Sequence, residues 1–229
     1  IGAMHLMGLA IEVLRSKGHK ISLQEEEAAT IAILLHDIGH GPFSHALEHT
    51  LVNGIKHEDI SMLMMDKLND EFDGRLTPAI TIFRGKYHRN FFCQLISGQL
   101  DLDRMDYLNR DSFFTGVSEG VIGSDRIIEM LDVHEGNLVL EEKGIYSVEK
   151  FITARRLMYW QVYLHKTVVS AEHLLINTLK RAKQVSLEGK ELFASPALAY
   201  FLKNNITRSD FETNPLTLDT FALLDDYDI

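Results

Sequence analysis

The stretch 34-LLHDIGHGPFSH-45 decides how the chain folds around it, because it ends an apolar helix with an adjacent histidine and aspartate. Two glycines and a proline follow closely, so a helix cannot continue through this segment. Side chains of consecutive residues point about 100° apart on an ideal α-helix. His36 and Asp37 can therefore converge on one ligand only where the helix ends or is distorted, and the break at 39–42 provides that point.

The residue types of this pair suggest a metal site. An imidazole nitrogen and a carboxylate oxygen together suit a divalent transition metal, or magnesium or manganese when more oxygen ligands join. Taken alone, the pair has a simpler interpretation, in which His36 interacts with the helix dipole and Asp37 caps a turn. The longer pattern H-D-x-G-H-G-x-x-S-H adds His40 and His45 and favours the metal-site hypothesis.

A metal site needs a further carboxylate, and 99-QLDLDRMDYLNRD-111 offers several. Asp103, Tyr107 and Asp111 follow one another at i, i+4 and i+8, so they share one stripe of a helix. Apolar residues lie on every side of this helix, and buried carboxylates need a partner. A cation is a natural partner. The alternative is a solvated acidic face paired with the neighbouring arginines.

Two further groups are candidates for proton transfer. His57, in K-H-E-D, begins a predicted helix, whose positive dipole end favours the neutral imidazole. His45 and Glu48 lie at i and i+3 of a short helix expected from about Pro42 to Val52, and such a pair could orient a proton donor. The simpler alternatives are a surface histidine and a surface ion pair.

The rest of the chain predicts a mainly α-helical fold. Helices are expected over 1–17, from a capping box at Ser22 to Asp37, from about His57, over 90–111, and from about Val148 to Lys183. The alternating segment 138–148 predicts a small β-hairpin around Lys143 and Gly144. The C-terminal segment is less regular, with a helix expected over 191–204 and a loop over 207–218.

Composition sets limits on function. The 229 residues are 45% hydrophobic and carry a net charge of −10, as in a globular protein of one large or two small domains. This charge argues against non-specific nucleic-acid binding, although a local cluster of Arg and Lys can still hold a small anion. The single cysteine, Cys93, is expected in the core and fits a reducing compartment such as the cytoplasm. No apolar run approaches the ~20 residues of a membrane span.

The combined motifs resemble the HD-domain phosphohydrolases. They are His36-Asp37, then G-H-G-P-F-S-H, then His57-Glu58, then D-x-D-R-x-D-Y-x-x-R-D. The pattern is most similar to the branch of the SAM-and-HD-domain deoxynucleoside triphosphate triphosphohydrolases. The resemblance covers residues 1–185, expected to form the HD-domain catalytic core, with 186–229 as an extension of the same domain. It implies a helical bundle that holds one divalent metal ion, which could be Mg, Mn, Fe, Ni or Zn.

The resemblance implies the metal ligands. His36, Asp37 and Asp103 match three ligands of the family. The fourth is a histidine in the family motif H-S-(Ile/Leu)-G, which would lie just before Ile1, so we expect a segment upstream of this sequence. His5 is no substitute, because it lies about 240° further around the helix.

The resemblance also implies catalytic and substrate contacts. His57 would be the general acid, with His40 and His45 lining the phosphate pocket and Glu48 or Glu58 orienting His57. The substrate contacts would be Arg104, Arg155 and Lys166 to phosphates, Tyr107 and Asp111 to the sugar, and Tyr163 nearby. Two positions depart from the family, since Glu48 replaces an aspartate and Arg104 replaces a lysine.

The implied reaction is hydrolysis of a dNTP to a deoxynucleoside and triphosphate, by a cytoplasmic homo-oligomer. One alternative keeps the metal but takes another nucleotide: a monophosphate, a cyclic nucleotide or a modified one. The other alternative is a nucleotide-binding or scaffold module whose site is catalytically weak.

Overall fold

The structure is a computed structural model that describes residues 1–43 and 50–229. It divides into two compact units, residues 1–36 with 71–165 and residues 37–70 with 166–229. The chain passes from the first unit to the second between His36 and Asp37. Within the described part of the chain, no helix is both long and apolar enough to cross a membrane.

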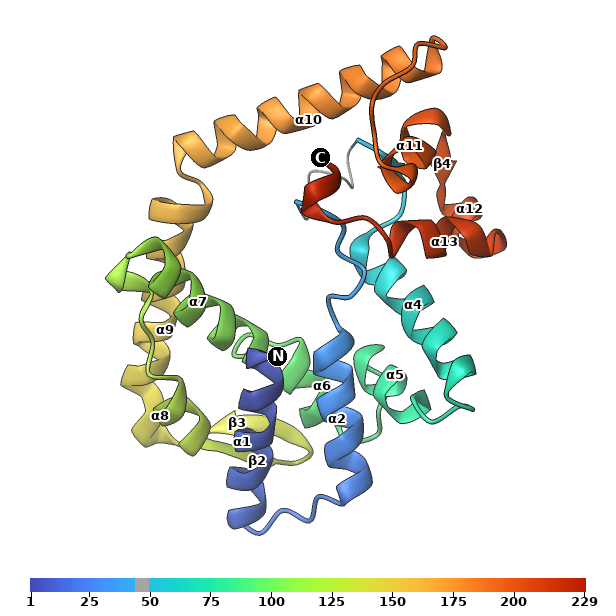
Figure 1. Ribbon diagram of the computed structural model, residues 1–229. Helices are drawn as coiled ribbons and strands as arrows, with labels where there is room; N and C mark the ends of the chain where they lie inside the picture. The colour runs from blue at the N-terminus through green and yellow to red at the C-terminus, as the bar shows by residue number, and fades with distance from the viewer. Residues whose placement is uncertain (44–49) are drawn as a thin grey trace. The chain divides into compact units, whose positions relative to one another are not determined.

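The first unit consists of helices and one antiparallel strand pair (Figure 1). Its helices are α1 (Gly2–Ser16), α2 (Leu23–Leu35), α5 (Thr77–Phe83), α6 (Asn90–Ile96), α7 (Leu102–Thr115), α8 (Ser124–Glu129) and α9 (Ile145–Met158). Its strands are β2 (Leu131–His134) and β3 (Asn137–Leu140), its 3-10 turns are Ser118–Gly120 and Glu142–Gly144, and a π-helical segment covers Tyr159–Tyr163. The mainly α-helical fold expected from the sequence is confirmed.

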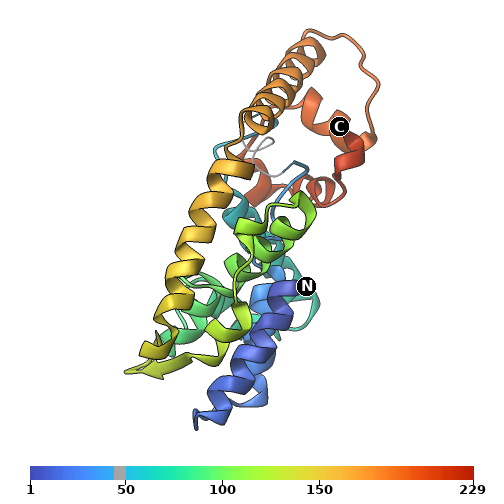
Figure 2. The same ribbon diagram turned by 90° about the vertical axis from the view of Figure 1, so that its left-hand side faces the viewer.

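Helix α1 is the central element of this unit. It packs against both α2 and α7, and the two views show α1 and α2 side by side (Figures 1 and 2). Met7, Ile11 and Leu14 recur at helical spacing and are fully buried. Cys93 is buried in the same core, as expected.

The start of α2 is fixed by the expected capping box. The Ser22 hydroxyl accepts from the Glu25 backbone N–H, and the Glu25 carboxylate accepts from the Ser22 backbone N–H. Burial raises the pKa of Glu25, but hydrogen bonds from Ser22 and Arg89 outweigh it and leave the pKa below its ordinary value. Arg89 lies 2.7 Å from the Glu25 carboxylate and so ties α2 to the start of α6.

The β-hairpin lies earlier in the chain than the sequence analysis placed it. Strands β2 and β3 pair with Leu131 opposite Leu140, and Glu135 and Gly136 form the turn with φ of 49° and 77°. Two positive φ values give the tight turn that suits the twist of a hairpin. The expected turn at Gly144 is instead part of the 3-10 turn before α9. A Cβ on Gly144 would lie 2.6 Å from Leu140 Cδ2, so a larger residue would force the Leu140 side chain to move.

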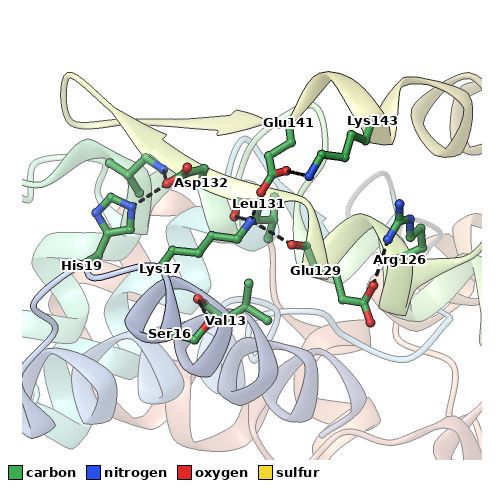
Figure 3. A network of polar contacts seen from close by, with 11 residues as sticks. Val13, Ser16, Lys17, His19, Arg126, Glu129, Leu131, Asp132, Glu141 and Lys143 are labelled. Carbon is green, nitrogen blue, oxygen red and sulfur yellow. Dashed lines mark hydrogen bonds and ion pairs between the residues drawn. The ribbon is translucent and has the colours of Figure 1, made fainter.

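Polar contacts attach the hairpin to the C-terminal end of α1 (Figure 3). The Lys17 ammonium donates to the backbone carbonyls of Glu129 and Leu131 at 2.8 Å and to the Glu141 carboxylate at 2.7 Å. His19 lies 2.5 Å from the Asp132 carboxylate, and this hydrogen bond lowers the pKa of Asp132. One lysine thus pairs with a carboxylate and donates hydrogen bonds to two backbone carbonyls.

The second unit contains the other helices and a short parallel strand pair. Its helices are α4 (His57–Glu71), α10 (Lys166–Leu187), α11 (Pro196–Lys203), α12 (Arg208–Thr213) and α13 (Pro215–Phe221), followed by a 3-10 turn at Asp226–Asp228. Strand β1 (Val52–Asn53) pairs with β4 (Ile206–Thr207). The short helix expected from Pro42 to Val52 falls mainly on 44–49, outside the described residues, and Val52 itself begins β1.

The prediction of a loop over 207–218 is wrong, because most of this segment is helical. The Thr207 hydroxyl and the Asp210 carboxylate form a capping box for α12, and the Asn214 side chain caps α13. Phe211 is buried, and the centroid of its ring lies 6.5 Å from the centroid of the Phe201 ring and 5.6 Å from that of the Phe221 ring. Each helix is too short to show a period in the sequence, and this aromatic packing stabilises both.

Replacing Ser22 by alanine removes the side-chain acceptor of the Glu25 N–H, which lies 3.2 Å away. We expect the free energy of unfolding to fall by about 1 kcal/mol, as for other N-cap substitutions. Chemical denaturation followed by circular dichroism measures this change. The control is Ser16→Ala, since that hydroxyl donates to the Val13 carbonyl and caps no N-terminus. Equal losses in the two variants would contradict the capping assignment.

Candidate metal and nucleotide site

The histidine of the His-Asp pair lies at the point where α2 ends. Helix α2 ends at Leu35, and His36 is its C-cap. One ring nitrogen, Nδ1, lies 2.7 Å from the Ile33 carbonyl oxygen, and the other, Nε2, lies 3.4 Å from the Asp103 carboxylate. Both residues belong to the first unit, although 67 positions separate them in the sequence.

This geometry suits a proton or a metal ion between the two groups. A carbonyl oxygen only accepts hydrogen bonds, so Nδ1 of His36 carries the proton. In the neutral ring, the lone pair of Nε2 then faces a carboxylate oxygen of Asp103, and two acceptors repel each other. Either a second proton or a metal ion resolves the conflict. Histidine ligands of metals usually donate their other N–H to a carbonyl or carboxylate, as His36 does to Ile33.

The spacing also fits a metal ion. Neighbouring nitrogen and oxygen ligands of a tetrahedral ion lie roughly 3.4 Å apart when each is about 2.1 Å from the metal. His36 and Asp103 match that separation, with the nitrogen and oxygen donors that divalent transition metals accept.

Helix α7 presents Asp103 because Asp101 fixes its first turn. The expected helix 90–111 is in fact α6 and α7, interrupted at Gly98, where a Cβ would lie 2.5 Å from the Gln94 carbonyl oxygen. Asp101 is 3% exposed and accepts from the backbone N–H groups of Arg104 at 2.8 Å and Gly98 at 3.2 Å. Burial raises the pKa of Asp101 above its ordinary value. Asp101 is therefore a helix cap and not part of the acidic stripe.

The far end of the α7 stripe carries a cluster of tyrosines. The Tyr163 hydroxyl donates to the Asp111 carboxylate at 2.7 Å, and the Tyr107 ring meets the Tyr163 ring edge-on at 6.2 Å. Burial, followed by the bond to Asp111, raises the pKa of Tyr163, so its hydroxyl keeps its proton. Arg155 lies over the ring of Tyr159 at 5.8 Å, and Tyr159 in turn packs on Tyr163. The predicted sugar contacts and Arg155 thus belong to one cluster.

A π-helical segment brings Tyr163 to Asp111. The sequence analysis expects an unbroken helix from Val148 to Lys183, but α9 gives way to π-helix over Tyr159–Tyr163, and α10 begins at Lys166. Leu164 N–H donates to the Tyr159 carbonyl, five residues back, at 2.8 Å. Such wide turns occur frequently at functional sites. No composition signal marks this one in the sequence.

The second unit brings three more of the predicted residues together. Ligand atoms of Asp37, His40 and His57 lie within 4.8 Å of one another, and Nε2 of His40 is 3.8 Å from the Asp37 carboxylate. The rings of His40 and His57 stack at 3.9 Å with 16° between their planes. Nε2 of His57 is 3.5 Å from the Glu58 carboxylate, the partner expected to orient it.

Some predicted residues lie elsewhere, and one neighbour was missed. His45 and Glu48 lie outside the described residues. Lys166 is exposed and begins α10, in the second unit. Ser61 was not among the residues predicted from the sequence, but it is fully buried and hydrogen-bonded to Gly39, next to the His-Asp pair. Its signal was weak: a small polar residue one helical turn after His57, among apolar neighbours.

Comparison with known proteins identifies the family. The HD domain model matches residues 3–111, and the HD associated region model matches residues 122–197. The chain therefore belongs to the HD-domain phosphohydrolase superfamily, near the branch that contains the SAMHD1 proteins.

Individual relatives agree with this assignment. The chain is 37% identical over 209 residues to the uncharacterized protein YwfO of Bacillus subtilis. It is 31% identical over 203 residues to a Dictyostelium discoideum protein named as a deoxynucleoside triphosphate triphosphohydrolase SAMHD1 homolog. A crystal structure of a phosphohydrolase from Bacteroides thetaiotaomicron superposes with a TM-score of 0.97 at 59% identity.

These relatives are longer than the chain. The matches cover 88% and 80% of this chain but 46% of the Bacillus protein and 39% of the Dictyostelium protein. The Bacteroides superposition covers 99% of this chain and 56% of that one. The chain thus spans about half the length of the proteins it matches.

Replacing Tyr163 by phenylalanine tests the link between the π-helical segment and α7. Asp111 loses a hydrogen bond from a partly buried donor, so we expect the free energy of unfolding to fall by about 1–2 kcal/mol. Thermal denaturation at neutral pH measures the change. Tyr159→Phe is the matched control, because that hydroxyl makes no hydrogen bond within the described residues. If Tyr159→Phe lowers the stability as much, the loss in Tyr163→Phe does not come from the hydrogen bond to Asp111.

Proposed function

We propose that this protein is a metal-dependent hydrolase of deoxynucleoside triphosphates that releases a deoxynucleoside and triphosphate. The observation that supports it best is the approach of His36 Nε2 to the Asp103 carboxylate at 3.4 Å, with the other ring nitrogen bound to a carbonyl. The name of the Dictyostelium relative supports the choice of substrate.

His36 and Asp103 would hold the metal, and Asp37, the next residue after His36, is proposed as a third ligand. When bound, a divalent ion would lower the pKa of water and neutralise charge on the phosphate.

Cationic side chains would bind the triphosphate. Arg155 is the strongest candidate, because its buried Nε has no hydrogen-bond partner among the described residues and would gain one from a phosphate oxygen. Arg104 lies 3.4 Å from the Asp101 carboxylate and, on our proposal, turns its remaining N–H groups to the phosphates. Lys166 is proposed as a third cation. In a chain of net charge −10, these cations would attract an anionic ligand.

Histidines of the second unit would handle the proton. Water attacks the α-phosphorus, the bond from phosphorus to O5′ breaks, and His57 donates a proton to O5′ as the deoxynucleoside leaves. The proton that water loses passes to the solvent, which later reprotonates His57. Glu58, 3.5 Å away, would hold the ring, and His40 stacks on it at 3.9 Å. We assign His45 to the phosphate pocket and Glu48 to orienting His57 on the resemblance alone.

Tyr107 and Asp111 would recognise the sugar. The Tyr163 hydroxyl already donates to Asp111 Oδ2, so the other carboxylate oxygen would accept a hydrogen bond from the substrate 3′-hydroxyl. A site that provides an acceptor for a hydroxyl rejects an analogue without that hydroxyl, because the acceptor is then left buried and unpaired.

Removing one ligand tests the metal and the reaction together. We expect the wild type to release triphosphate from dNTPs and to contain a divalent metal in stoichiometric amount. In Asp103→Ala, we expect both metal content and turnover to be lost, the latter by at least about 10³-fold, because the metal supplies the main charge stabilisation. Elemental analysis and chromatography of the products measure the two effects.

Asp125→Ala is the control for this experiment, since Asp125 is an exposed acid on α8. Release of orthophosphate or pyrophosphate from dNTPs would contradict the proposed cleavage site. A protein that binds nucleotide and metal but turns over nothing would support the binding-module alternative instead.

A second experiment tests recognition of the 3′-hydroxyl. We expect dideoxynucleoside triphosphates to be hydrolysed about 10²-fold or more slowly than dNTPs in kcat/KM, because Asp111 then loses its donor. Asp111→Asn should reduce this preference, since an amide oxygen is a weaker acceptor than a carboxylate. Steady-state kinetics on matched pairs of nucleotides gives both ratios. If the wild type hydrolyses both kinds of nucleotide at equal rates, Asp111 does not recognise the 3′-hydroxyl.

A further inference from the structure

The turn that follows the His-Asp pair, residues 37–41, is fastened to the first two turns of α4. The Gly39 N–H donates to the Ser61 hydroxyl at 2.9 Å, and this bond is buried. Ser61 is 0% exposed and follows His57 by four positions, which is one turn of the same helix.

The contact leaves no space for a side chain at position 39. A Cβ on Gly39 would lie 2.3 Å from the His57 carbonyl oxygen and 2.3 Å from the Ser61 backbone nitrogen. The φ of Gly39 is not in the left-handed region, so the glycine is required by proximity and not by backbone conformation. The turn therefore lies directly on the helix backbone.

The same two segments meet again one residue later. His40 follows Gly39, and its ring stacks on the His57 ring at 3.9 Å with 16° between the planes. Ser61 and His57 are thus on adjacent turns of α4, and Gly39 and His40 are consecutive in the turn. A shift at the Gly39–Ser61 bond must change the offset of the two rings.

We propose that Ser61 is a positioning residue, which sets the orientation of the His40–His57 pair through its hydrogen bond to Gly39. This inference rests on the proposed function of His57 as the proton donor. Without the hydroxyl, the buried N–H of Gly39 has no acceptor, and the turn must move to find one. We therefore expect the loss of the Ser61 hydroxyl to misalign His57 as the proton donor and to leave phosphate binding little changed.

The test compares two leaving groups. A deoxynucleoside leaves as an alkoxide and needs a proton, whereas p-nitrophenolate leaves without one, so p-nitrophenyl triphosphate keeps the triphosphate but removes the need for the acid. In Ser61→Ala we expect kcat for a dNTP to fall about 10²-fold, with KM within about threefold, since a misplaced general acid costs this much. For p-nitrophenyl triphosphate we expect kcat to fall less than about threefold, since that step needs no acid.

Two further variants separate positioning from stability. Ser61→Cys keeps a side chain of similar size and a weak acceptor, so it should restore part of the lost kcat on the dNTP. Thr217→Val is the matched control, because Thr217 is also 0% exposed and its hydroxyl bonds to that of Tyr200 at 2.8 Å in the same unit. It should lower stability without distinguishing the two substrates. Equal loss on both substrates in Ser61→Ala, or no loss on either, would overturn the proposal.

A readout without turnover keeps the two proposals distinct. Stacked imidazoles shift each other's ring proton resonances, so Ser61→Ala should move the His40 and His57 signals in NMR spectra, and Thr217→Val should not. If the wild type cleaves neither substrate, the proposed function fails, and these spectra decide the positioning claim alone. Unchanged histidine signals in Ser61→Ala would then refute it.

Discussion

A ring nitrogen that faces a carboxylate oxygen at 3.4 Å is the constraint on which the rest of the site depends. The carbonyl of Ile33 holds the proton on the opposite side of the His36 ring, so a second proton or a metal ion would reconcile the two acceptors. Two helix ends create this conflict. Helix α2 stops where the glycine-rich turn begins, and α7 starts where Asp101 caps it. A hydrogen-bonded side chain defines each end: His36 at the end of α2 and Asp101 at the start of α7.

Two arginines proposed to bind phosphate belong to a chain that is acidic as a whole. The protein carries a net charge of −10, which repels polyanions, yet Arg104 and Arg155 are both proposed to contact the triphosphate. Arg155 is held over the ring of Tyr159, a contact that attracts the guanidinium and partly shields it from water. A small anion with several phosphates would therefore be favoured over a long nucleic acid, which is the discrimination that a nucleotide hydrolase needs.

Much of the fold and of the candidate site could be predicted from the sequence, because the same motifs contain helix signals and side chains that can bind metal or substrate. The capping box at Ser22 and the common stripe of Asp103, Tyr107 and Asp111 follow from spacing alone, and the helical fold is confirmed. The hairpin was misplaced, because Lys143-Gly144 has the composition of a turn while the real turn, Glu135-Gly136, sits between short strands. Helices α12 and α13 were missed, since their stability comes from aromatic packing around Phe211 and not from periodicity.

Other predictions from the sequence concern properties that a single chain does not reveal. Homo-oligomeric assembly and a cytoplasmic location stay predictions, as does the identity of the metal. The buried serine next to the turn could not have been chosen from the sequence, because its value lies in a contact with a backbone nitrogen 22 positions away.

The π-helical segment has a consequence for how this chain tolerates length changes. A π turn holds one residue more than an α turn, so Tyr159–Tyr163 behaves as a single-residue insertion in an otherwise regular helix. Deleting Gln161 would let the segment relax to ordinary helix without the loss of an apolar side chain. It would also rotate Tyr163 by about 100° relative to α9 and carry its hydroxyl away from Asp111. At this place the spacing of the chain matters more than the identity of most of its side chains.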